Sequence, residues 1–375
     1  MMLDNFKKLV PIALSQLVTG ASLLSASDYE TRISQLEAKV NDVSMNTVVD
    51  TKGGRTANYH PKAYGEGFFV TGDFLWWQAE QDGLEYAVVT DVYTGPESVY
   101  NHGRVKEIGF EWGPGFRVGL GYNLPWDGWD LYANWTHFHK DSHSHVSAPS
   151  DKNVSPVWSA YLNTPKNRAS EASAHYGLTY NILDLELGRN FFASHSLSLR
   201  PFIGIRGAWI DQDVRYEYEN LQVVVPPKDE HNKLKNDFNA GGFRAGFNTT
   251  WHFTRNWGIF GNIAASLMYG EFHVAQKLHW PNAFGAIIDQ KEEIDLVRGN
   301  LELGAGLLWE AYFSKGRYHL ALTAAYEVLQ WFSQNQLLQF SDPTKLALSS
   351  NGTINQKKDG DLGLHGGTLS ARFDF

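Results

Sequence analysis

Residues 367–375 read Gly-Thr-Leu-Ser-Ala-Arg-Phe-Asp-Phe and end the chain on an aromatic side chain. Small or apolar residues occupy every second position from Gly367 to Phe375, and polar or charged residues occupy the positions between them. A period of two predicts a β-strand with one apolar and one polar environment. In a transmembrane β-barrel the last strand closes the sheet, turns its apolar side to lipid and places an aromatic at the interface. The stretch therefore favours an all-β fold, a transmembrane antiparallel up-and-down barrel.

The overall composition excludes several classes of protein. The 375 residues carry a net charge of -9 and contain no block of Lys or Arg, so we expect no nucleic-acid partner. Cysteine is absent, which excludes disulfide frameworks, thiolate metal sites and cysteine nucleophiles. Aromatic residues make up 14% of the chain and include 13 Trp, a surplus typical of the aromatic girdles at a membrane interface.

The first 27 residues predict a signal peptide. Lys7 and Lys8 precede a mostly apolar stretch, residues 9–24, and small residues follow at positions 25–27. This order of charged, apolar and small residues matches secretory export. A short buried helix is the alternative.

Residues 28–44 predict a short helix of coiled-coil type, and residues 45–66 predict a flexible linker. The apolar residues of the helix follow one another at alternating steps of four and three. They are Tyr29, Ile33, Leu36, Val40 and Val43. Isolated helices of this length are marginal, so the pattern predicts pairing with other copies of the chain, and a solvated spacer helix is the alternative. By analogy with porins, we expect a homo-oligomer, namely a trimer.

From residue 67 to residue 375 the chain repeats half-apolar strands, which predicts the barrel itself. The first strand covers residues 67–76, the last is the stretch quoted above, and four hairpins with short turns lie between them. The hairpins join 116–122 to 129–135, 183–187 to 197–205, 243–251 to 257–267, and 301–309 to 318–326.

This count predicts at least ten strands, with long polar loops at the end opposite the short turns. The expected loops are residues 80–105, 139–173, 211–241, 271–295 and 331–364. Residues 84–93 or 106–112 are candidates for further strands, which leaves twelve or more open. The alternation slips between Ile182 and Leu183, as a β-bulge would cause.

Charged side chains occupy the strand face opposite to the apolar one. In lipid each would be costly, so we predict that they line an aqueous or ion-paired lumen. The predicted lumen-lining residues are Arg117, Arg200, Arg206, Arg244, Glu302, Glu310 and Glu327. Aromatic residues gather at every short turn, as an interfacial girdle requires. The alternative is a soluble sandwich with polar outer faces.

Residues 66–89, which begin Glu-Gly-Phe-Phe-Val-Thr-Gly-Asp-Phe-Leu-Trp-Trp, resemble the opening of the Legionella-type and chlamydia-related major outer membrane proteins. Residues 115–122, 128–132 and 200–210 are similar to later segments of that family. The resemblance implies a pore-forming barrel in the outer membrane of a Gram-negative bacterium. It also implies that Phe373 and Phe375 act as a barrel-assembly signal. Well-known members cross-link the envelope through cysteines, and this chain has none.

Signals for bound groups and for catalysis are weak. His137, His139, His143 and His145 form two His-x-His pairs that could present imidazoles to one divalent ion, but ordinary polar histidines explain them better. We therefore predict no metal, no cofactor and no catalytic residues.

These observations predict a porin-like channel for ions and small hydrophilic solutes, embedded in outer-membrane lipid and also acting as a surface protein. An adhesin or structural barrel with a closed lumen is the alternative, and a barrel enzyme with its site in the outer loops is a weaker one. Strand number decides how wide the lumen is, so a ten-stranded barrel filled by the predicted charges would be nearly closed.

Overall fold

The computed structural model describes residues 67–91, 103–125, 128–149, 152–160, 168–194, 196–222, 227–281, 288–314, 317–341 and 354–375. The predicted signal peptide, coiled-coil helix and linker lie outside these residues. Among the residues described, no helix is long and apolar enough to cross a membrane.

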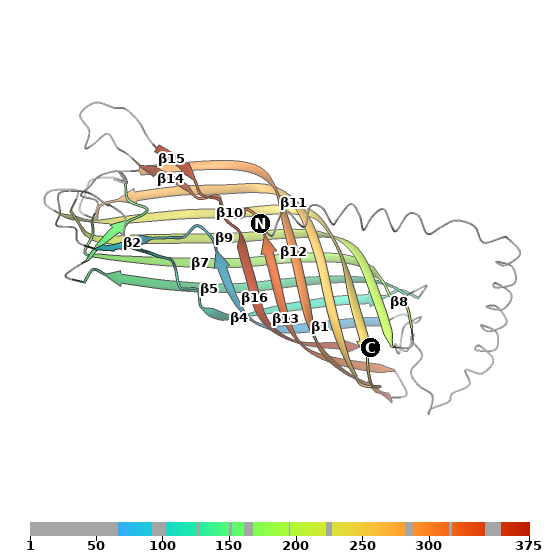
Figure 1. Cartoon of the computed structure of the whole chain (residues 1–375). Helices are drawn as coiled ribbons and strands as arrows, with labels where there is room; N and C mark the ends of the chain where they lie inside the picture. The colour runs from blue at the N-terminus through green and yellow to red at the C-terminus, as the bar shows by residue number, and fades with distance from the viewer. Residues whose placement is uncertain are drawn as a thin grey trace, which may run out of the picture. The chain divides into compact units, whose positions relative to one another are not determined.

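Ten antiparallel strands form a closed barrel (Figure 1). They are β1 (Gly67–Gln81), β4 (Trp112–Asn123), β5 (Trp129–Ser147), β7 (Glu171–Arg189), β9 (Leu197–Leu221), β10 (Lys228–His252), β11 (Trp257–His279), β12 (Ile288–Phe313), β13 (Tyr318–Trp331) and β16 (Leu362–Asp374). Each strand pairs with its neighbours in the chain, and β16 closes the ring by pairing with β1. The predicted fold and the minimum of ten barrel strands are confirmed.

The remaining strands lie outside the ring. β8 (Phe191–Phe192) is a two-residue strand at the turn between β7 and β9. A three-stranded sheet combines β2 (Ala87–Asp91), β3 (Gly103–Lys106) and β6 (Lys152–Pro156), and β14 (Leu338–Ser341) pairs with β15 (Ile354–Lys357). The strand predicted near residues 84–93 therefore exists, but it belongs to a small separate sheet. In Figure 1, β2, β14 and β15 lie at the end of the barrel opposite to the C-terminus.

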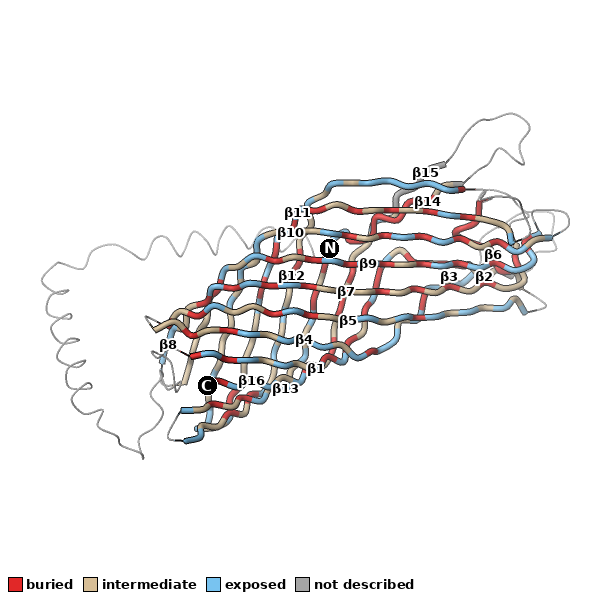
Figure 2. The backbone as a smooth tube through the Cα atoms, turned by 180° about the vertical axis from the view of Figure 1, so that it is seen from behind, coloured by how far each residue is buried: buried red, intermediate tan, exposed pale blue. Residues whose placement is uncertain are grey.

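Each long strand inverts its polarity part of the way along. On β9, Ile203, Ile205 and Trp209 face outward, whereas Glu217 and Glu219 on the same face are polar. The inward face changes in the opposite sense, from charged to apolar. Figure 2 shows buried residues alternating with intermediate or exposed ones along much of these strands, so the two faces remain distinct in both parts. We call the part near the short turns the apolar-faced half and the rest the polar-faced half.

This inversion corrects two predictions. The slip at Ile182 and Leu183 is not a bulge, because β7 pairs with β5 and with β9 without any shift in register. Ile182 faces inward in the polar-faced half, and Leu183 faces outward in the apolar-faced half. Large parts of the segments predicted as loops, including residues 211–221 and 228–241, are strand extensions. In these extensions the outward side chains are polar and the inward side chains are apolar, which is the reverse of the pattern that predicts the strands.

The polar-faced half contains an apolar core. Aromatic side chains from many strands are almost fully buried inside the ring. They include Trp77, Phe138, Tyr176, Tyr180, Tyr216, Tyr218, Phe238, Phe272 and Trp331. The outward side chains of this half are polar, as on a soluble protein, so burying the rings follows the ordinary hydrophobic effect.

Candidate functional site: a charged cavity below an aromatic core

A cavity of about 390 Å³ lies inside the apolar-faced half. Five arginines and five carboxylates line it. They are Arg117, Arg200, Arg206, Arg244, Arg372, Asp73, Asp184, Glu186, Glu302 and Glu327. Strand alternation places them there, because their neighbours in sequence face outward as apolar side chains. Six of the seven predicted lumen residues lie in this lining, and Glu310 does not.

Arg206 is the most buried of these arginines. It donates two hydrogen bonds to Asp184, at 2.6 and 2.7 Å, and one to the Asn300 side chain at 2.8 Å. It also pairs with Glu302, which accepts a second arginine, Arg244, at 2.6 Å. Glu302 thereby joins β9 and β10 to β12 through its two partners.

The same network continues around the wall. Arg244 pairs with Glu186, which also accepts a hydrogen bond from Arg200 at 3.0 Å. Arg200 in turn binds Asp130 through two nitrogens. The ion pairs therefore form one continuous chain across β5, β7, β9, β10 and β12. Mutual pairing offsets the cost of removing these charges from water.

A separate group of charges links three other strands. Arg117 of β4 lies 3.1 Å from Asp73 of β1 and 3.1 Å from Glu327 of β13. All three residues line the cavity. Arg117 thus links β1 to its sheet neighbour β4, and links both strands to β13, which is not adjacent to either of them in the sheet.

Glu310 lies close to the short turns, in a third group. His319 Nδ1 is 2.8 Å from Asp374, and its Nε2 is 3.2 Å from Glu310. Arg372 also contacts Asp374. This group anchors the last strand, β16, to β12 and β13 from inside the barrel.

An aromatic layer closes the cavity on the side of the polar-faced half. Tyr180 lines the cavity, and its hydroxyl accepts a hydrogen bond from Trp331 Nε1 at 3.3 Å. Beside Trp331, the rings of Phe238 and Phe272 stack with centroids 4.3 Å apart. These large apolar rings separate the charged cavity from the mouth of the barrel.

Beyond this layer, a polar segment folds into the mouth. Residues 334–339 are all buried, and we call residues 334–340 the inserted segment. Asn236 of β10 donates to the carbonyl oxygen of Gln334 at 3.0 Å, and the Phe340 N–H donates to Gln276 of β11 at 2.7 Å. Asn335 donates to the carbonyl oxygen of Asp82 at 2.8 Å. Side-chain amides, rather than apolar contacts alone, hold the segment in place.

Several polar atoms around the inserted segment have no hydrogen-bond partner among the described residues. They include both side-chain polar atoms of Gln334, Oε1 of Gln336, Nε2 of Gln276 and Oδ1 of Asn236. Buried polar atoms are normally satisfied by protein or by ordered water. These atoms around the inserted segment are therefore suited to bind ordered water.

Sequence reasoning missed two parts of this arrangement. Asp130 was not recognised, although it alternates with the apolar neighbours Trp129 and Leu131 and so has the inward parity. The inserted segment was assigned to a long loop, and its run of amides carries no periodic signal. The four histidines of β5, His137, His139, His143 and His145, face outward on the side opposite to the cavity.

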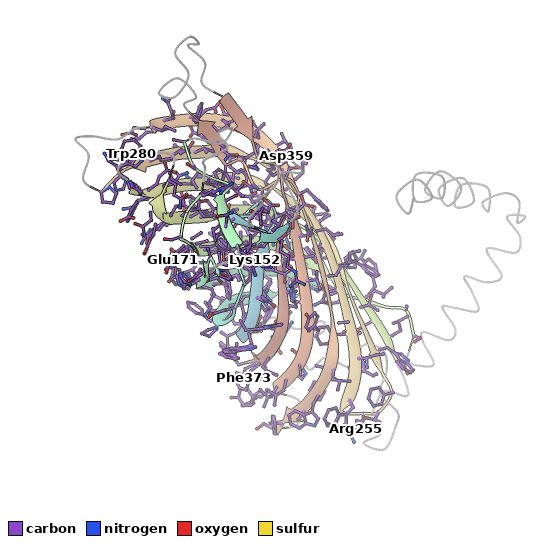
Figure 3. The ribbon with its side chains drawn as sticks, turned by 60° about the vertical axis from the view of Figure 1, so that its left-hand side comes forward. Lys152, Glu171, Arg255, Trp280, Asp359 and Phe373 are labelled. Atoms are coloured by element: carbon purple, nitrogen blue, oxygen red, sulfur yellow. The ribbon has the colours of Figure 1, made fainter. Side chains whose placement is uncertain are left out.

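Comparisons with known proteins agree with this architecture. The sequence profile of the family described as Legionella pneumophila major outer membrane protein precursor matches residues 63–375. The chain belongs to this family. It is therefore a protein of the bacterial outer membrane. In such barrels the short turns face the periplasm, so the polar-faced half projects outside the cell. Phe373 and Arg255 mark the short-turn end in Figure 3, and Trp280 and Asp359 lie toward the opposite end.

Several solved structures show partial similarity to this chain. The outer membrane protease OmpT from Escherichia coli shares 10% identity, with 82% of this chain and 96% of that chain covered, at a TM-score of 0.41. The toluene transporter TodX from P. putida shares 12% identity, with 85% of this chain and 91% of that chain covered, at a TM-score of 0.28. The translocator domain of the autotransporter NalP from Neisseria meningitidis shares 11% identity, with 95% of this chain and 100% of that chain covered, at a TM-score of 0.28. Scores this low carry no argument about function. No curated protein sequence matches the chain.

Proposed function

We propose that this protein is an outer-membrane pore for ions and small hydrophilic solutes, closed at its extracellular end in this conformation. The observation that carries the proposal is the charged cavity in the apolar-faced half. Burying ten charged side chains is costly even when they are paired, and well-packed apolar residues of similar volume are often as stable. A permanently sealed barrel would gain no stability from charged side chains in this half. In a lumen that fills with water, the same side chains would be solvated and would attract ions.

The inserted segment supports the same proposal. Six consecutive buried residues, four of them Gln or Asn, close the mouth through amide hydrogen bonds. Such bonds exchange readily for bonds to water, and each contributes only about 0.5–1.5 kcal/mol net. Displacing this segment is therefore far less costly than unfolding an apolar plug.

The lining charges predict weak ion selectivity. Five arginines and five carboxylates face the cavity, so neither sign dominates the local field. We expect the open pore to pass small anions and cations at comparable rates.

A surface barrel with a permanently closed lumen is the second candidate. The aromatic layer of Tyr180, Phe238, Phe272 and Trp331 favours it, because these rings fill the barrel above the cavity. Opening the pore requires this layer to move as well as the inserted segment. The enzyme alternative has no comparable support, since the cavity carboxylates are held by arginines.

Planar-bilayer conductance of the refolded protein separates the two candidates. We expect the native barrel to show infrequent current steps. A variant with residues 334–339 replaced by a Gly-Ser linker, in a Trp331→Ala background, should open more often. Heat-modifiable migration in detergent checks that both proteins are folded. If the folded variant is as silent as the native barrel, the pore assignment fails and the closed surface barrel stands.

The homo-oligomer predicted from residues 28–44 is a separate proposal. Replacing Ile33 and Leu36 by Glu should convert a trimer to a monomer and leave the barrel folded. Sedimentation in detergent measures the change. An unchanged sedimentation coefficient would contradict the coiled-coil prediction and would leave the pore proposal as it stands.

A further inference from the structure

Three metal-ligating side chains converge on the outer face of the polar-faced half. Glu271 and His273 extend from β11, and Glu293 extends from β12. Each offers one donor atom, and the three atoms lie within 4.8 Å of one another. In the part of the chain that the structure describes, no other three His, Asp or Glu residues each place one donor atom within this distance of the other two. We propose that these residues bind a divalent transition-metal ion of the Zn²⁺ type.

The sheet geometry holds the three ligands ready. His273 is the direct register partner of Glu293, and Glu271 lies two residues earlier on the same face of β11. His273 Nε2 is already 3.7 Å from a Glu271 carboxylate oxygen. In a tetrahedral zinc site the donor atoms lie about 3.4 Å apart. Small side-chain rotations close the remaining distance, so no backbone movement is needed.

The donor set favours a transition metal over Mg²⁺ or Ca²⁺. One imidazole nitrogen with two carboxylate oxygens suits Zn²⁺ and its neighbours, whereas Mg²⁺ and Ca²⁺ prefer oxygen alone. Three protein ligands leave one tetrahedral position open toward the outside. A water molecule or an external anion would complete the coordination. Two carboxylates beside one imidazole distinguish this site from the single exposed His–carboxylate pairs, such as His145 and Glu171.

The surrounding charges would favour a bound cation. Asp295 lies directly across the strand pair from Glu271, and Asp237 lies across from His273 on the other side. Like charges in these positions repel. Within the described residues, Glu293 and Asp295 form no ion pair, and Lys235, the lysine closest to Asp237, is shared with Asp213. A bound divalent ion would remove this repulsion.

The site lies on a part of the barrel wall that is paired on one side only. β12 pairs with β13 only from Asn300 to Phe313, so residues 288–298 form sheet pairs with β11 alone in the described structure. His273 and Glu293 belong to this extension. A metal joining β11 to β12 there would stabilise the hairpin, because binding to the folded state alone adds stability by mass action.

Zinc titration of the refolded full-length barrel tests the proposal. ZnCl₂ is titrated by calorimetry in a background of excess MgCl₂, with the native chain, His273→Ala and Glu293→Gln. The matched control is Asp141→Asn, because Asp141 lies 3.5 Å from both His139 and His175 and forms the other mixed cluster on the outer face. All these residues are exposed or half-buried, so folding should be unaffected.

We expect one site in the native barrel, weakened at least tenfold by His273→Ala and by Glu293→Gln and unchanged by Asp141→Asn. Co²⁺ should give the visible absorption of a tetrahedral site in the native chain and not in His273→Ala. Zinc should also slow hydrogen exchange of residues 288–299. Equal affinity in His273→Ala, loss of binding in Asp141→Asn alone, or full displacement by Mg²⁺ would each overturn the proposal.

Discussion

On β9, Ile203 and Ile205 face outward while Arg206 faces inward, whereas further along the same strand Glu217 faces outward while Tyr216 and Tyr218 face inward. The two halves of the barrel thus place opposite kinds of side chain on each face. Lipid surrounds one half and water surrounds the other. The same strand geometry therefore yields an interior of paired charges in one half and an aromatic core in the other.

The comparison separates two sources of stability. In the polar-faced half the hydrophobic effect drives the aromatic rings inward, as in a soluble protein. In the apolar-faced half lipid already solvates the apolar side chains, so moving them inward gains little. That half depends instead on the closed hydrogen-bonded sheet, and the pairing of its inward charges limits the cost of burying them.

The largest expected effect comes from the aromatic core. Trp331→Ala should lower the free energy of unfolding by about 3–5 kcal/mol, because it removes a fully buried ring. The matched control is Trp251→Ala, which removes an outward, half-exposed ring from the apolar-faced half and should cost clearly less. Urea unfolding in detergent, followed by heat-modifiable migration, measures both. Equal losses would mean that the two halves are not stabilised differently.

A charge placed on the outer face should distinguish the two halves directly. Leu185→Arg puts the charge on the lipid-facing part of β7 and should cost about 2–4 kcal/mol near the midplane. Ser173→Arg puts it on the same face of the same strand, in the polar-faced half, where it should cost almost nothing. Folding yield into lipid vesicles is the measurement. If both variants insert normally, the assigned membrane boundary is wrong.

A buried carboxyl in the polar-faced half predicts a pH dependence. Burial raises the pKa of Glu230 to about 7. The folded state therefore binds a proton that the unfolded state releases, and stability should fall as pH rises from about 4.5 to 7. Glu230→Gln should remove this fall and stabilise the barrel at pH 8 by up to about 3 kcal/mol.

At pH 4 the Glu230→Gln variant and the native chain should be nearly equally stable, since the carboxyl is then mostly protonated in both the folded and the unfolded state. Glu219→Gln is the control, because Glu219 is exposed and lies on β9 next to Tyr218, the register partner of Glu230. Hydrogen exchange of the polar-faced half at both pH values checks the prediction. A pH-independent difference between variant and native chain would contradict it.

The smallest effect on stability is expected at the last residue. Phe375 donates its backbone N–H to Phe68 at 3.0 Å and stacks on Phe373. Its deletion should cost about 1.5–3 kcal/mol in a refolded barrel, yet it should strongly reduce the amount inserted in cells if the last strand is an assembly signal. Phe253→Ala removes another exposed turn-side aromatic and serves as the control. Normal outer-membrane levels of the truncated chain would count against the assembly signal.

The sequence alone determined the strands and their faces in the apolar-faced half. Alternation with period two is a local property, so the ten strands, the four short turns and the inward parity of Arg206 and Glu302 follow from neighbouring residues. The same alternation predicts a lipid-facing side wherever the outward residues are apolar. In the polar-faced half the outer solvent is water, so the outward residues are polar, and composition there does not separate strands from loops.

Only the tertiary structure decided which groups meet across the barrel. Arg206 and Glu302 lie 96 positions apart in the chain, and their contact depends on the order and register of four strands. The inserted segment closes the mouth through amides that show no pattern in the sequence. His273 and Glu293 become partners only when β11 and β12 pair in their observed register. Local sequence carries the period of a strand, whereas ion pairs, plugs and metal ligands are set by long-range geometry.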